Sequence, residues 1–228
     1  MNLFDILGPV MVGPSSSHTA GAVRIGYISG KLLQDHVRKA EILLHGSFAT
    51  TGIGHGTDKA LIAGLLGMHP DDIRIPASFD LAKKAGMEFT FSTVTLKDAH
   101  PNTAVLRLSG EHGRKIEVQA ASIGGGRILI AKLDGIEVNF TAEKPTLIVH
   151  NVDQPGHVAQ VTTMLAEKQV NIATLQLYRD KRGGYAVMVI ETDQEVPEES
   201  VTWLEQLDGI IKVTYILSLI HISEPTRL

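Results

Sequence analysis

The sequence contains no cysteine in its 228 residues. A chain without cysteine forms no disulfide, has no thiol nucleophile and binds no metal through thiolates. Its ten histidines are therefore the side chains to examine for proton transfer. Half of them stand in ordinary sequence contexts and are interpreted as surface or core residues, namely His36, His45, His69, His112 and His221.

An excess of positive charge and long apolar segments are also missing. Lys and Arg number 21 against 25 Asp and Glu, a formal net charge of -4, which does not favour nucleic acid or an anionic membrane as a partner. No apolar run approaches the roughly 20 residues that span a bilayer. Met1 to Gly8 lacks the basic-then-apolar order of a signal peptide. We therefore expect a cytoplasmic protein with no nucleic-acid and no membrane partner.

What is present suffices for two folded domains. Hydrophobic residues make up 43% and charged residues 20%, so the chain can form cores and is not expected to be disordered. A change in composition near Glu143-Lys144-Pro145 predicts a linker between domains at 1–143 and 146–217. Residues 218–228 have neither turn chemistry nor a periodic partner, and we interpret them as a non-native or disordered tail.

Helical and strand patterns alternate in the first domain. Apolar residues recur at helical spacing in 25–32 and 61–68, and strand patterns occur at 40–45, 105–108 and 128–131. Asp134 and Gly135 are typical of a hairpin turn. The first domain is therefore predicted to be α+β.

The second domain shows a more regular order. Strand patterns occur at 146–150, 171–178, 185–191 and 210–216, with helical patterns at 156–168 and after Pro197. In the second of these strands, Ala173, Leu175 and Leu177 share one side. The order is β-α-β-β-α-β, the ferredoxin-like split unit.

Four hydroxyl residues and a histidine lie together at 13–21, GPSSSHTAG, directly before the first predicted helix. Unpaired N–H groups at a helix start suit a carboxylate, and Ser16, Ser17 and Thr19 add hydroxyl donors beside His18. Capping by Ser17 or Thr19 would explain one hydroxyl but not four. The segment therefore favours a binding site.

Two further turns carry histidine. His55 lies between two glycines, and turn chemistry explains those glycines as well as a ligand does. His100 and Asn102 flank a proline, so the segment is either an ordinary turn or a place where Asn102 binds a ligand and His100 moves protons. A fourth segment, Gly124 to Gly126, is either an anion-binding nest of N–H groups or a hairpin or bulge.

Four segments in this order are similar to the β subunit of iron–sulfur-dependent L-serine dehydratases, of the two-subunit type with a C-terminal ACT domain. They are Gly13-Pro14-Ser15-Ser16-Ser17-His18-Thr19, Gly54-His55-Gly56-Thr57-Asp58, His100-Pro101-Asn102-Thr103 and Ser122-Ile123-Gly124-Gly125-Gly126. The similarity runs from Phe4 to about Ile216. The first domain is also similar to the allosteric substrate-binding domain of some phosphoglycerate dehydrogenases.

The resemblance implies a lyase without pyridoxal phosphate, which converts L-serine to pyruvate and ammonia and is active only with an α subunit. Cysteines of that α subunit would hold a [4Fe-4S] cluster, a Lewis acid for the serine hydroxyl, and this chain is expected to bind no metal itself. His55 is the first candidate for the base that removes the Cα proton and His18 the second, in assignments that remain exchangeable. The implied substrate-binding residues are Ser16, Ser17, Thr19, His100 and Asn102, with Gly124 and Gly125 lining the same cleft.

In the ACT domain, the resemblance places an effector site at the turn after the first strand. Asn151 and Asp153 would take the ammonium group of an amino acid such as L-serine, and N–H groups near Gly156 its carboxylate. Such sites commonly form where two ACT domains pair, so self-association is also expected. The alternative is an ACT domain that only dimerises.

Two other functions compete with the enzyme. One is a non-catalytic regulatory protein that binds amino acids, built like the tail of some phosphoglycerate dehydrogenases. A sensor needs no three convergent imidazoles, so His18, His55 and His100 favour the enzyme. The other is a zinc protein, which ranks last because the histidine spacings lack the i, i+4 pair of helix-borne sites.

Overall fold

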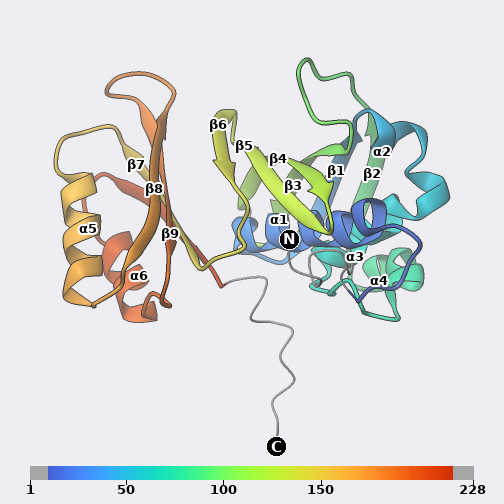
Figure 1. Ribbon diagram of the computed structural model, residues 1–228, viewed down its shortest axis with the longest axis horizontal. Helices are drawn as coiled ribbons and strands as arrows, with labels where there is room; N and C mark the ends of the chain where they lie inside the picture. The colour runs from blue at the N-terminus through green and yellow to red at the C-terminus, as the bar shows by residue number, and fades with distance from the viewer. Residues whose placement is uncertain (1–9, 218–228) are drawn as a thin grey trace, which may run out of the picture. The chain divides into compact units, whose positions relative to one another are not determined.

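The computed structural model describes residues 10–217, and the chain divides into two compact units between Asn139 and Phe140 (Figure 1). This division falls a few residues before the linker expected at Glu143-Lys144-Pro145. Phe4, where the family resemblance begins, and the tail at 218–228 lie outside the described residues. Each unit is described by itself.

The first unit contains thirteen described helices, helical turns and strands. In chain order these are η2 (Ser16–Gly21), α1 (Ala22–Leu33), β1 (Val37–Leu44), α2 (Ser47–Thr50), η3 (Ile53–His55), α3 (Thr57–Leu65), η4 (Ile75–Ala77), α4 (Ser78–Lys84), β2 (Glu88–Thr93), β3 (Thr103–Gly110), β4 (Lys115–Gly124), β5 (Arg127–Leu133) and β6 (Ile136–Phe140).

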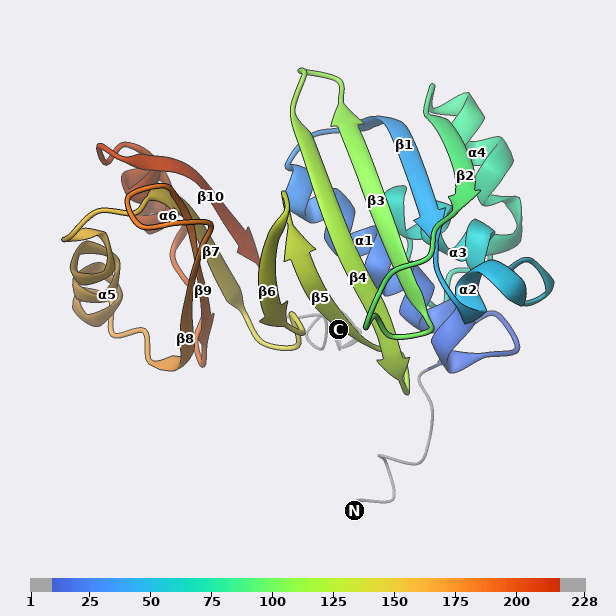
Figure 2. The same cartoon turned by 90° about the horizontal axis from the view of Figure 1, so that it is seen from above.

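A six-stranded mixed sheet organises this unit, in the order β2-β1-β3-β4-β5-β6. β1 pairs in parallel with β2 and antiparallel with β3, and the pairs β3–β4 and β4–β5 are antiparallel. Helices α1 and α3 pack against each other along one face of the sheet (Figure 2). The predicted α+β class is confirmed.

The apolar periodicity of the first predicted helix marks its buried face. Ile25, Ile28 and Leu32 are each fully buried on α1. The second helix ends earlier than its pattern suggests, because α3 stops at Leu65 and Gly67 takes a φ of +83°. Met68 is buried beyond the helix end. The helical spacing of buried apolar residues therefore extends beyond the last residue of the helix.

Two glycines allow α1 and α3 to cross at close range. A Cβ atom on Gly26 would overlap the carbonyl oxygen of Leu61 and lie 3.0 Å from Leu65 N. A Cβ on Gly64 would overlap the carbonyl oxygen of Val23 and lie 2.6 Å from Tyr27 N. Each glycine thus faces the backbone of the other helix, and neither side has a flexible side chain that can give way.

The second unit has the predicted β-α-β-β-α-β order. Its elements are β7 (Thr146–Val152), α5 (His157–Glu167), β8 (Ile172–Arg179), β9 (Tyr185–Thr192), α6 (Glu198–Glu205) and β10 (Ile210–Ile216). The strands form one sheet in the order β10-β7-β9-β8, with every pair antiparallel. Both helices lie on the same face of this sheet (Figure 1). Within residues 10–217, no helix combines the length and apolarity needed to cross a membrane.

The core of the second unit lies between this sheet and its helices. Val149 of β7, Leu165 of α5 and Leu204 of α6 are among its fully buried members. Strand β8 lies at the edge of the sheet, and its register with β9 shifts between Ile172 and Thr174. Leu177 on this strand remains 43% exposed.

Candidate active site

His18 lies on a helical turn that continues into α1. The turn η2 is π-helical and runs into α1 without a break. Ser15 is its N-cap, and the Ser15 hydroxyl accepts a hydrogen bond of 3.1 Å from the N–H of His18. The capping residue is therefore Ser15 and not Ser17 or Thr19. Ser16 and Ser17 are half-buried within the turn.

Both ring nitrogens of His18 have hydroxyl neighbours. Nε2 lies 3.2 Å from Ser47 Oγ and 3.2 Å from Thr51 Oγ1, and Nδ1 lies 3.5 Å from Ser15 Oγ. The Thr51 hydroxyl donates its single proton to the carbonyl oxygen of Ser47 at 2.9 Å, so it accepts from His18. We therefore assign the proton of neutral His18 to Nε2.

His55 has the opposite tautomer. Its Nδ1 lies 3.0 Å from the carbonyl oxygen of Thr51, which can only accept, so Nδ1 carries the proton. The lone pair of the exposed His55 ring is then on Nε2. The centroids of the His18 and His55 rings are 5.0 Å apart, with their planes inclined at 38°. Thr51 contacts both rings, one through its hydroxyl and the other through its carbonyl.

The surroundings of His18 favour its neutral form. Burial lowers the pKa of His18 from its usual value, the neighbouring His55 lowers it further, and a hydrogen bond with Ser47 partly opposes these effects. A positive charge on His55, whose ring centroid lies 5.0 Å away, disfavours protonation of His18. His18 is thus suited to stay neutral when His55 takes a proton.

A cavity of about 510 Å³ opens beside His55, with Thr19, Asp58 and Lys59 also in its wall. This volume is in the range of small-molecule pockets. Thr19 is only 3% exposed, and its hydroxyl donates to the carbonyl oxygen of His55 at 3.5 Å. Gly13 leaves room for Thr19, because a Cβ there would lie 2.5 Å from Thr19 Oγ1. Thr19 therefore supports the backbone of His55, and substrate binding by Thr19 stays a prediction.

The segment with His100 and Asn102 reaches the same region through its backbone. The N–H of Ser47 donates to the carbonyl oxygen of Pro101 at 2.8 Å. Gly46 permits this approach, since a Cβ there would lie 2.6 Å from that oxygen. His100 Nδ1 accepts a 3.1 Å hydrogen bond from the N–H of Asn102, and the ring is exposed. The turn thus adjoins the helix that carries Ser47.

The fourth segment joins the others at Ser122. The N–H of Ser122 donates to the carbonyl oxygen of Asn102 at 2.9 Å. Gly21, at the end of the first segment, packs so closely on Ser122 that a Cβ would overlap its hydroxyl. Gly125 and Gly126, with φ of +61° and +77°, form the two-residue turn between β4 and β5. This hairpin accounts for the glycines, and a binding role for Gly124 and Gly125 stays a prediction.

Sequence reasoning assigned no role to four residues of this region, namely Ser47, Thr51, Asp58 and Lys59. The available signal was the pair of hydroxyl residues spaced by four, Ser47 and Thr51, just ahead of the Gly-His-Gly turn. Asp58 and Lys59 begin the helix after that turn and place opposite charges in the wall of the His55 cavity. Within residues 10–217, no three or more His, Cys, Asp or Glu side chains gather as a metal site.

Comparison with known proteins identifies the family. Residues 2–86 match the family model described as serine dehydratase beta chain, and residues 145–209 match the ACT domain model. The chain is 40% identical over 196 residues to the L-serine dehydratase beta chain of Peptoniphilus asaccharolyticus, covering 86% of this chain and 88% of that protein. It is also 40% identical over 215 residues to a probable L-serine dehydratase beta chain of Bacillus subtilis, covering 94% and 97%.

The chain belongs to the L-serine dehydratase beta-chain family.

This beta chain also resembles part of a different enzyme. D-3-phosphoglycerate dehydrogenase of Methanocaldococcus jannaschii is 26% identical over 198 residues, which cover 86% of this chain but 37% of that enzyme. The resemblance expected for the first unit and the ACT domain expected for the second are both confirmed.

In the ACT domain, the predicted effector residues lie between β7 and the start of α5. Asn151 is 3% exposed, and its Oδ1 has no hydrogen-bond partner among the described residues. Asp153 Oδ2 already accepts from the N–H of Gly183 at 2.9 Å and from Arg179 Nη1 at 3.0 Å, and these bonds lower the pKa of Asp153. Gly156, with a φ of +109°, is the N-cap of α5. One carboxylate oxygen of Asp153 is therefore committed to the turn.

A buried histidine makes the stability of the ACT domain dependent on pH. His150 is 1% exposed, its Nδ1 is bonded to the hydroxyl of Tyr185, and it pairs with Lys212 across β7 and β10. Burial, with a smaller contribution from Lys212, lowers the pKa of His150 from 6.5 to about 4. Between these values the unfolded chain binds more protons than the folded one, so stability falls as the pH falls.

We expect the free energy of unfolding of the ACT domain to drop by about 2 kcal/mol between pH 7 and pH 5 through His150. Urea unfolding followed by the fluorescence of Trp203, the single tryptophan and a residue of α6, measures this change. His150→Gln removes the titrating group and should lose that part of the pH dependence. Equal pH dependence in both proteins would contradict the assignment.

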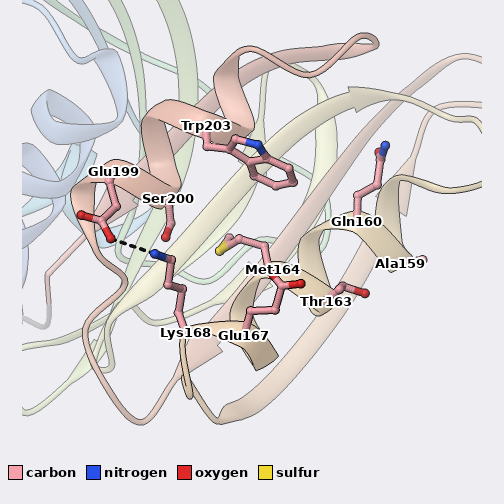
Figure 3. Close-up of a pocket in the computed structure, with 9 residues that line it drawn as sticks. All are labelled: Ala159, Gln160, Thr163, Met164, Glu167, Lys168, Glu199, Ser200 and Trp203. Carbon is pink, nitrogen blue, oxygen red and sulfur yellow. Dashed lines mark hydrogen bonds and ion pairs between the residues drawn. The ribbon is translucent and has the colours of Figure 1, made fainter.

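A second cavity, of about 670 Å³, lies between α5 and α6 of the ACT domain. Figure 3 shows Met164 of α5 and Trp203 of α6 pointing into it, with the Lys168–Glu199 ion pair of 2.8 Å at one end. Trp203 is 44% exposed. None of the three predicted effector residues lines this cavity, so the effector turn and the cavity are different places on the domain.

Proposed function

We propose that this beta chain is one subunit of an L-serine ammonia-lyase, which converts L-serine to pyruvate and ammonia together with an α subunit. The observation that carries the proposal is the pair of His18 and His55, with opposite tautomers and a ring separation of 5.0 Å, beside a cavity of substrate size. The relatives named L-serine dehydratase beta chain support the substrate and the need for a partner.

His55 is proposed as the base that removes the Cα proton of serine. Its Nδ1–H donates to the Thr51 carbonyl, which leaves the Nε2 lone pair for the incoming proton. The same carbonyl stabilises the imidazolium that results, because the Nδ1–H bond strengthens when the ring is charged. His18 stays neutral beside it and avoids a second positive charge.

The substrate is a zwitterion, and the walls of the His55 cavity offer both charges. Asp58 and Lys59 line it together with Thr19. Ser16 and Ser17, on the turn that carries His18, and His100 and Asn102, on the turn that adjoins α2, remain the proposed donors to the substrate carboxylate and the partners of its ammonium group. Gly124 and Gly125 are proposed to line the same cleft.

The proposed [4Fe-4S] cluster belongs to the α subunit. This chain has no cysteine, and residues 10–217 gather no set of three metal-ligating side chains, so the residues present do not fit a cluster of their own. When bound in the partner, the cluster would supply a Lewis acid for the departing hydroxyl group. The part of this chain is to bind serine and to take its Cα proton.

The ACT domain is proposed to sense an amino acid, with L-serine as the first candidate. Asn151 supports this role, because it is buried near the end of β7 and its amide oxygen has no hydrogen-bond partner within residues 10–217. Asp153 and the start of α5 at Gly156 would complete the site, and pairing of two ACT domains would enclose it.

A regulatory protein without activity is the second candidate, because phosphoglycerate dehydrogenase shares most of the length of this chain. The paired imidazoles distinguish the two functions. A sensor of amino acids gains nothing from a histidine whose basic nitrogen is held free by a backbone carbonyl.

Reconstitution tests the proposal. The purified chain alone should form no pyruvate from L-serine. Mixed under anaerobic conditions with a cysteine-bearing α subunit, iron and sulfide, it should gain serine-dependent pyruvate formation. A complex that assembles with its cluster and remains inactive on serine would refute the enzymatic function and favour the regulatory one.

A further inference from the structure

We infer that Thr51 and Ser47 are positioning residues for the two imidazoles: their hydroxyls hold the proton of His18 on Nε2, while the Thr51 carbonyl holds the proton of His55 on Nδ1. This inference rests on the proposed function, because it concerns the same site. Neither residue was among the site residues predicted from the sequence.

The two hydroxyl protons have defined acceptors. Thr51 Oγ1 donates to the carbonyl oxygen of Ser47 at 2.9 Å, so its lone pairs face outward. Ser47 Oγ lies 3.0 Å from Thr51 Oγ1, which has no further proton to give, so Ser47 is the donor in that pair. Both oxygens therefore turn lone pairs toward His18 Nε2, at 3.2 Å each.

The neighbours of the His18 ring fix its orientation. Two acceptors at Nε2 and the Ser15 hydroxyl near Nδ1 hold the two edges of the ring. Phe48 meets the ring edge-on, with centroids 5.3 Å apart and planes at 65°, and is fully buried. The imidazole is thus held by hydroxyl groups at both ring nitrogens and by the buried Phe48 ring beside it.

The His18 ring lies beside the proposed base, His55. His55 lies 5.0 Å from His18 and is bonded to the main chain of Thr51. Thr51 therefore acts on the tautomers of both imidazoles, through its hydroxyl at His18 and its carbonyl at His55. A shift of the His18 ring would therefore displace the neighbouring His55 ring. An error of about 1 Å in the position of a base lowers the rate about 10²-fold.

The test uses the full chain, labelled with ¹⁵N at histidine, and reads the tautomers from the ring nitrogen shifts. The wild type should show His18 protonated on Nε2 and His55 on Nδ1. In the double variant Ser47→Ala/Thr51→Val, which keeps the Thr51 carbonyl, His18 should shift toward Nδ1–H with Ser15 as acceptor, and His55 should not change. Each single variant should shift His18 less, since one hydroxyl remains.

Thr51→Ser and Thr50→Val are the matched controls. Thr51→Ser keeps the hydroxyl and should restore the wild-type tautomer. Thr50→Val removes a hydroxyl from the adjacent residue, whose Oγ1 donates to the carbonyl oxygen of Gly46, and should leave both tautomers unchanged. If His18 stays protonated on Nε2 in the folded double variant, the inference is wrong.

The consequence for turnover is measured in the α–β complex. The double variant should lower kcat about 10- to 100-fold with KM within about twofold, because the substrate contacts remain while the rings lose their alignment. An unchanged kcat would also overturn the positioning role. The tautomers are read without the α subunit, so an inactive wild-type complex would refute the proposed function and leave the tautomer result to decide this inference.

Discussion

His55→Ala should lower serine-dependent pyruvate formation by the α–β complex about 10²- to 10⁴-fold, with cluster content unchanged. This range is what a positioned general base contributes to a proton transfer. The loss should appear in kcat, because His55 is proposed to act on the Cα proton, whereas the predicted contacts to carboxylate and ammonium come from other residues. Steady-state pyruvate assays, with the cluster absorbance recorded on the same sample, measure both quantities.

His36→Ala is the matched control, because His36 is an exposed histidine near β1, where none of the four motifs lies. It should retain wild-type kcat and KM. His18→Ala should lose less than His55→Ala, since His18 has both ring nitrogens engaged by hydroxyls. A larger loss for His18→Ala would make His18 the base in place of His55. Wild-type rates for a His55→Ala complex with an intact cluster would show that His55 is not the base.

Gly26→Ala should destabilise the first unit by about 3 kcal/mol or more, at the upper end of the cost of overpacking. The new methyl group would meet the backbone of α3 at Leu61 and Leu65, which cannot rotate away. We expect the melting temperature of that unit to fall by about 10 °C. Thermal unfolding followed by circular dichroism, compared with wild type, checks the prediction.

Gly30→Ala on the same helix provides the control. A Cβ there would lie 3.7 Å from the carbonyl oxygen of Leu65, an ordinary contact distance. Because alanine is a better helix former than glycine, this variant should be neutral or more stable by about 0.5–1 kcal/mol. Similar melting temperatures for Gly26→Ala and Gly30→Ala would show that the helices separate without cost.

The same crossing determines the geometry of the candidate site. α1 continues from the turn that carries His18, and α3 begins two residues after His55. Moving the two helices apart would therefore separate the two imidazoles. A Gly26→Ala protein that still folds at low temperature should lose activity for this reason, although Gly26 touches neither ring.

The order and type of the main elements followed from the sequence alone. Ile25, Ile28 and Leu32 placed α1 correctly, and the ACT domain appeared with its complete β-α-β-β-α-β order, because burial on one face imposes a period on the sequence. The ends of elements were less well determined. Met68 continues the helical period but lies beyond the end of α3, since a left-handed glycine reverses the chain while the side chain stays buried.

The candidate site was predicted as four motifs, and the structure brings their segments into one region. Hydrogen bonds from Ser47 to Pro101 and from Ser122 to Asn102 connect these turns, and both run between backbone groups. Such contacts leave no trace in the choice of side chain. Ser47 and Thr51 were given no role for a different reason, because two hydroxyl residues spaced by four do not indicate which ring they will contact.

The sequence by itself determined that this chain has no thiolate for a cluster and that an α+β unit precedes a β-α-β-β-α-β unit, because composition and periodicity are local properties. Only the tertiary structure decided that His18 and His55 become neighbours with opposite tautomers. That outcome depends on the close crossing of two helices and on hydroxyl and carbonyl groups brought together by it, which no single segment of the sequence encodes.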